Sequence, residues 1–134
     1  MSRYDQELVS PYNLWLWYYS LKYLNELGLR EIEARTLKLS GYLIEGLLDL
    51  DLKVDTPIEP EERAGLVSYN TGREELNWQI LEACRGRIPM RMNNIFISLR
   101  YQGGVGGLRV SCHYFNTKDD LDKLIKVTKE VISK

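Results

Sequence analysis

The chain has 134 residues, a formal net charge of −1 and 28% charged residues, which is ordinary for one globular domain with or without a terminal extension. Basic and acidic residues are interleaved without a basic run, so nucleic acid is not an expected partner. No stretch is apolar and long enough to span a bilayer, and the N-terminus lacks the apolar core of a signal peptide, so we expect no membrane contact and a cytoplasmic location. Cys84 and Cys112 lack metal-ligand spacing and are expected to be reduced thiols, with no metal bound.

Aromatic and aliphatic side chains crowd residues 13–27, which predicts a helix that ends at Gly28. The apolar residues occupy every face of this helix rather than one stripe, so the helix has to be covered on most sides. One small domain can hardly provide that cover. We therefore expect residues 13–27 to contact a partner, either a second copy of the chain in a homo-oligomer or a different chain.

Residues 29–50 predict a second, longer helix, because leucines recur there at helical spacing. The pattern then changes to short runs, with predicted strands at Leu52–Thr56, Gly65–Thr71, Ile95–Tyr101 and Leu108–Phe115, and with helices over residues 73–84 and after Thr117. The sum is an α+β fold: a small, mostly antiparallel sheet of about four strands with helices on one face, preceded by a long helical arm. We divide the chain into an N-terminal segment with the aromatic helix, residues 1–28, and a domain of residues 29–134.

The two last predicted strands read as a hairpin around a glycine-rich loop at residues 102–107. If Tyr101 and Leu108 share the core face, a symmetric hairpin sets three further pairs: Arg100 with Arg109, Ser98 with Ser111, and Phe96 with His113. Two arginines directly opposite each other destabilise a sheet unless an anion lies near them. The polar face of the hairpin is thus a candidate site for a carboxylate held by a guanidinium fork. The alternative is that both arginines point into water and splay apart.

No residue is assigned a catalytic role. His113 could act as a base, but no second group is spaced to work with it, and the favoured interpretation is a strand histidine hydrogen-bonded to a neighbour. Cys112 alternates onto the apolar face of its strand and is expected in the core, as is Cys84 on its helix. Ser111 and His113 remain candidates for lining the carboxylate site.

Residues 107–117, Gly-Leu-Arg-Val-Ser-Cys-His-Tyr-Phe-Asn-Thr, with the acidic helix start at Asp120, resemble the C-terminal signature of class V aminotransferases. Residues 27–35 are similar to the long linking helix of that family, and residues 63–69 to its first small-domain strand motif. In the family's order, these segments cover nearly the whole chain. The resemblance implies the small C-terminal domain of a fold-type-I enzyme that uses pyridoxal phosphate.

The resemblance also implies that Arg109 binds the α-carboxylate of an amino-acid substrate, whereas it gives Arg100 no catalytic role. The family's Schiff-base lysine and the other residues that hold the coenzyme belong to a large domain that precedes the matched region. No cofactor-binding residue is therefore expected in this chain alone. The cysteine desulfurase branch places a nucleophilic cysteine in a mobile loop, and neither Cys84 nor Cys112 lies in such a loop, which disfavours that branch.

Two functions from different classes follow. The first is a fragment or split subunit of a class V aminotransferase-like enzyme, which contributes Arg109 and is not catalytic alone. It would need a separate large-domain chain, contacted through residues 13–27. The second is a stand-alone, non-enzymatic binding or assembly module that kept the fold and forms a homodimer. In either case the expected ligand is a small amino or carboxylic acid.

Overall fold

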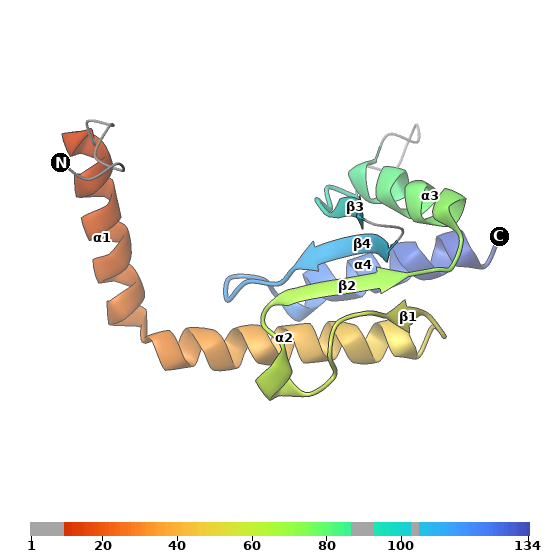
Figure 1. Ribbon diagram of the computed structural model, residues 1–134, viewed down its shortest axis with the longest axis horizontal. Coiled ribbons are helices and arrows are strands. Elements are labelled where there is room, and N and C mark those ends of the chain that lie inside the picture. The colour runs from red at the N-terminus through yellow and green to blue at the C-terminus, as the bar shows by residue number, and fades with distance from the viewer. Residues whose placement is uncertain (1–9, 87–92, 103–104) are drawn as a thin grey trace. The chain divides into compact units, whose positions relative to one another are not determined.

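The computed structural model describes residues 10–86, 93–102 and 105–134 (Figure 1). The chain divides into two compact units, residues 1–32 and residues 33–134. The first unit contains α1 (Pro11–Leu27), and α2 (Leu29–Leu48) begins in it and continues into the second. The second unit holds the sheet and the remaining helices.

Helix α1 agrees with the predicted aromatic helix and starts at Pro11, where the missing N–H is tolerated because no helical partner exists for it. It ends at Gly28, whose φ of 88° lies in the region that favours glycine. No residue of α1 is buried, and Trp17 is 72% exposed. The helix therefore presents apolar surface on every side, as its sequence predicts.

Four strands form one antiparallel sheet in the order β1-β2-β4-β3. The strands are β1 (Lys53–Val54), β2 (Leu66–Asn70), β3 (Ser98–Gln102) and β4 (Val105–Ser111). The short 3-10 helix η1 (Pro60–Glu62) lies between β1 and β2 in the chain, and the other helices are α3 (Glu74–Arg85) and α4 (Lys118–Ile132). The predicted α+β fold with a long N-terminal helical region is confirmed.

Helices of the second unit cover one face of the sheet, and α4 lies behind β2 and β4 in Figure 1. Alternate strand residues point toward them and are buried, namely Val67, Tyr69, Leu108 and Val110. These side chains form one core with buried residues of α2, α3 and α4, such as Leu43, Ile80 and Leu124. The sheet is therefore apolar toward the helices and free to be polar on its other side.

The capping box predicted for the last helix is present. Thr117 Oγ1 accepts a hydrogen bond from the main-chain N of Asp120 at 3.3 Å, and Asp120 Oδ2 accepts one from the main-chain N of Thr117 at 2.9 Å. Neither main-chain N–H has a partner inside the helix, and each one donates to the side chain of the other residue. The hydrogen bond from the Thr117 main chain to the carboxylate is the largest of the causes that lower the pKa of the Asp120 carboxyl.

The β3–β4 hairpin has a different register from the predicted one. Leu99 pairs with Leu108, so Ser98 stands opposite Arg109 and Arg100 stands opposite Gly107. The predicted pairs are therefore wrong: Arg100 with Arg109, Ser98 with Ser111, and Phe96 with His113. The shift amounts to two residues, which keeps every side chain on its predicted face of the sheet.

The cause of this difference is that two of the glycines assigned to the loop belong to β4. Gly106 pairs with Tyr101, and a Cβ there would collide with the carbonyl oxygen of Arg100. A Cβ on Gly107 would collide with the carbonyl oxygen of Tyr69. These glycines allow close backbone approach inside the sheet instead of forming a wide loop. Residues 103–104 of the predicted loop lie outside the described residues.

Asn77 is fully buried on α3 and joins the end of β2 to the edge strand β3. Its Oδ1 accepts hydrogen bonds from Thr71 N at 3.1 Å and Thr71 Oγ1 at 2.9 Å. Its Nδ2 donates to Asn70 Oδ1 at 3.1 Å and to the Tyr101 hydroxyl at 2.8 Å. All four hydrogen-bonding positions of the amide are used, which is the condition for burying it without a large penalty.

Replacing Asn77 by alanine should lower the free energy of unfolding by about 2–4 kcal/mol, because several partly buried polar groups lose their partner at once. Urea unfolding followed by circular dichroism measures the change. Gln79→Ala, an exposed position on the same helix, is the control and should change stability by less than about 0.5 kcal/mol. An Asn77→Ala variant as stable as this control would show that the amide network does not hold β3 in place.

Candidate functional site

The face of the sheet turned away from the helices is called the open face. Its strand residues alternate with the buried ones and are Leu66, Ser68 and Asn70 on β2, Gly107, Arg109 and Ser111 on β4, and Ser98 and Arg100 on β3. On the edge strand β1, Lys53 pairs with Asn70 and so belongs to the same face. This face carries cations and hydroxyls but only one large apolar side chain among these residues.

Arg109 lies in the middle of the open face. Its strand has a neighbour on each side, and both registers put a serine beside the arginine: Ser68 from β2 and Ser98 from β3. Ser98 Oγ donates to the main-chain oxygen of Arg109 at 3.4 Å. The three residues form one row across the sheet, in which two short side chains flank a long one.

The guanidinium group of Arg109 has unused hydrogen-bonding capacity. Its Nε is buried and has no hydrogen-bond partner, and Arg109 makes no ion pair within the described part of the chain. The sequences of β2, β3 and β4 contain no aspartate or glutamate. A buried donor without an acceptor costs about 1–3 kcal/mol, and an anion that supplied the acceptor would remove that cost.

Arg100 is the second cation on this face. It stands opposite Gly107, so it is a diagonal neighbour of Arg109 rather than its direct partner. Diagonal neighbours in antiparallel strands have Cα atoms about 7–8 Å apart, within reach of long side chains. The Arg100 side chain is exposed and has no ion-pair partner among the residues that the structure describes.

The two remaining candidates lie at and beyond the end of β4. Ser111 is exposed and follows Arg109 by two residues on the same face. His113 is not in a strand, because β4 ends before it. Its main-chain N donates to Asn116 Oδ1 at 2.9 Å, its Nδ1 accepts from Tyr114 N at 3.1 Å, and its ring stacks on Phe115 with centroids 4.6 Å apart. These contacts give His113 a role in the local turn.

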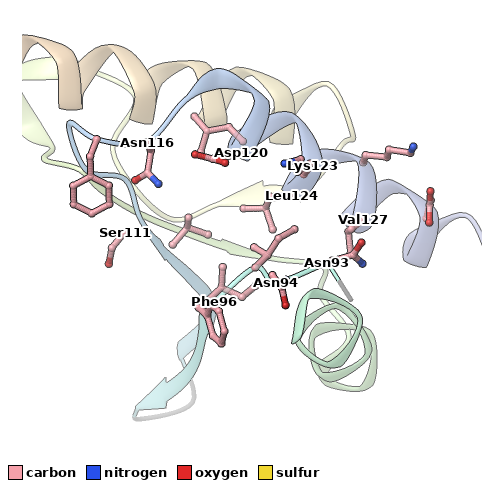
Figure 2. A pocket seen from close by; sticks show the side chains of 16 residues that line it. Asn93, Asn94, Phe96, Ser111, Asn116, Asp120, Lys123, Leu124 and Val127 are labelled. Atoms are coloured by element: carbon pink, nitrogen blue, oxygen red, sulfur yellow. The ribbon is translucent and has the colours of Figure 1, made fainter. Parts of the chain in front are cut away.

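A surface hollow among the described residues is separate from the two arginines. It has a volume of about 940 Å³ and lies between residues 93–97, the end of β4 and α4 (Figure 2). Three of its polar lining groups serve the local structure: Asn93 Nδ2 donates to the Ala83 carbonyl at 3.0 Å, while Asn116 and Asp120 accept the turn and capping hydrogen bonds. Arg100 and Arg109 do not line it.

Neither cysteine is available as a nucleophile. Cys84 is 0% exposed and Cys112 is 4% exposed, as their predicted core positions require. Burial raises the pKa of the Cys84 thiol to about 12 and that of Cys112 to about 11. Since the reactive form of cysteine is an accessible thiolate, both residues serve packing.

No family model matches the sequence. Among solved structures, the chain is similar to a cysteine desulfurase from Thermococcus onnurineus NA1 in its apo form, with a TM-score of 0.70 and 22% identity over 84% of this chain and 28% of that one. A NifS-like protein is similar with a TM-score of 0.58 and 21% identity, over 75% of this chain and 28% of its own. The likeness shows the fold. The chain shares its fold with part of these two proteins and spans about 28% of the length of each.

Pyridoxal phosphate, which the family resemblance implies, does not fit the described residues, because none of their lysines is buried in a pocket where it could form a Schiff base. Every lysine of the sequence lies among the described residues, and every one is exposed. A lysine that forms a Schiff base is a desolvated amine within a pocket. The same part of the chain has no cluster of three or more His, Cys, Asp or Glu residues placed to hold a metal ion, and none of its helices is apolar and long enough to cross a membrane.

The two thiols should not react with a disulfide reagent such as dithionitrobenzoate near pH 8 while the protein is folded, because burial removes both access and thiolate. Unfolding in urea should release both thiols for rapid reaction, which provides the internal control. Absorbance of the released thionitrobenzoate measures each rate. Rapid reaction of one thiol in the folded protein would contradict the assignment of both cysteines to packing.

Proposed function

We propose that this chain is a carboxylate-binding domain of a class V aminotransferase-like protein and that Arg109 holds the carboxylate of a small amino or carboxylic acid. The observation that carries the proposal is the Arg109 guanidinium on the open face, without an acidic partner among the described residues and with a buried Nε that lacks an acceptor. A carboxylate supplies two acceptor oxygens with the spacing of the guanidinium fork. The sequence resemblance gives the same residue the same ligand.

The surroundings of Arg109 favour a small ligand. Ser68 and Ser98 flank it with short side chains, and Ser111 follows it on the same face with an exposed hydroxyl. Hydroxyls can donate to a carboxylate oxygen that the guanidinium leaves unpaired. Because β4 is an inner strand held on both sides, the backbone under Arg109 is rigid, which preorganises the fork for binding.

The chain is proposed to bind and not to catalyse. Its cysteines are buried, its lysines are exposed, and the Nδ1 atom of its one histidine already accepts a hydrogen bond in the local turn. Chemistry would then come from a large domain, either on a separate chain or on a further part of the same protein. Binding through Arg109 would hold the substrate carboxylate while that domain acts on the rest of the molecule.

Titration with L-alanine and with acetate tests the proposal, with binding followed by shifts of backbone and arginine Nε signals in nitrogen-15 NMR spectra. Arg109→Ala should weaken binding by about 10–100-fold, because a charge-assisted hydrogen-bond pair contributes about 1.5–3 kcal/mol. Arg109→Lys should weaken it as well, because an ammonium group keeps the charge but lacks the planar fork.

Lys53→Ala is the matched control, since it removes a cation from the same face at the far edge strand, where Lys53 pairs with Asp55 at 2.9 Å. This variant should bind both acids as the unchanged protein does. Failure of the unchanged protein to bind either acid, or equal binding by Arg109→Ala, would reject the carboxylate site.

A second function is supported by α1. None of its residues is buried, yet large apolar side chains are exposed all around it, among them Leu14, Trp15, Leu16, Trp17 and Tyr18. Exposed apolar surface of this extent marks an interaction site. The alternative proposal is therefore a stand-alone assembly module in which α1 helices of two copies cover each other.

Sedimentation equilibrium at low micromolar concentration should then give the mass of a dimer. Trp17→Arg should shift the equilibrium to monomer by placing a charge in the interface, with little change in the circular dichroism of the folded domain. Phe96→Arg is the control, because Phe96 is 87% exposed but lies outside α1. A monomeric unchanged protein would exclude the homodimer.

A further inference from the structure

Arg100 has no role when the ligand carries a single carboxylate, yet the open face holds it beside Arg109. The strands that bear the two arginines and the neighbouring β2 contain no acidic residue. The acid closest in sequence to the sheet, Asp55, pairs with Lys53 on β1, at the edge opposite β3. Positive charge is therefore balanced at one edge of the sheet and left unbalanced around the two arginines.

The register shows why both arginines can reach one ligand. Arg109 lies in a row between Ser68 and Ser98, and Arg100 lies in the next row, opposite Gly107. A glycine at that position brings no side chain between the two guanidinium groups, and its lack of a Cβ is required by the close carbonyl oxygen of Tyr69. One planar carboxylate fills one guanidinium fork, which leaves the second fork open.

We infer that the ligand of this face is a small acid with two anionic groups, such as a dicarboxylic acid or an amino acid with an acidic side chain. Arg109 holds one carboxylate and Arg100 holds the other. The inference rests on the carboxylate site proposed for Arg109 and adds the class of ligand. The diagonal spacing of the two arginines, about 7–8 Å between Cα atoms, lets their long side chains converge on groups that are a few bonds apart.

Comparison of succinate with butyrate tests this inference, because the two acids have the same carbon chain and differ in the second carboxylate. NMR titrations at one fixed ionic strength should show succinate binding at least about tenfold tighter than butyrate. Arg100→Ala and Arg100→Gln should remove this preference and leave the affinity for butyrate within about twofold of the original. Lys53→Ala should keep the preference, since Lys53 lies on the same face but at the far edge.

The outcomes separate the two proposals. Equal affinities for succinate and butyrate in the unchanged protein, or a preference that survives both Arg100 substitutions, would overturn the second anionic group. Equal losses of succinate affinity in Arg100→Ala and Lys53→Ala would also overturn the second anionic group, because they would indicate a diffuse effect of net charge. In each of these cases the carboxylate site stands if Arg109→Ala abolishes butyrate binding. An unchanged protein that binds neither acid would overturn both proposals.

Discussion

The pairing of β4 with a strand on each side is the constraint on which the candidate site depends. A slip of one residue would turn Arg109 toward the helices, because strand side chains alternate between faces. The slip is prevented from the other side of the sheet, where Leu108 and Val110 of the same strand are buried against the helices together with Tyr69. The apolar core on one face of the sheet thus orients an arginine on the other face.

The sequence predicted the elements with strong local signals. Helix α1 ends at Gly28 and α4 starts at the Thr117 capping box, since both signals need only neighbouring residues. Alternation also predicted the correct face for Arg100 and Arg109, and a register error of two residues preserves that face. The chemical character of the open face could therefore be derived before its geometry.

The row of residues around Arg109 could not be derived in the same way. The glycine content of residues 102–107 predicts a loop because glycine is common in turns, but Gly106 and Gly107 are required for close approach to the backbone of Arg100 and Tyr69. The contact with Tyr69 is non-local, so no pattern within the hairpin reveals it. Ser68 was missed for the same reason, because it comes beside Arg109 only through the β2–β4 register.

The fold of this chain does not by itself indicate a reaction. Its backbone resembles part of a cysteine desulfurase, but a reaction depends on side chains, and at 22% identity those can differ throughout. Both thiols of this chain fill the core, and each lysine points to solvent. The open face of the sheet presents the guanidinium fork of Arg109 on a rigid inner strand. Because such a fork needs only the register and the core beneath it, the proposed carboxylate site requires no nucleophile among the described residues.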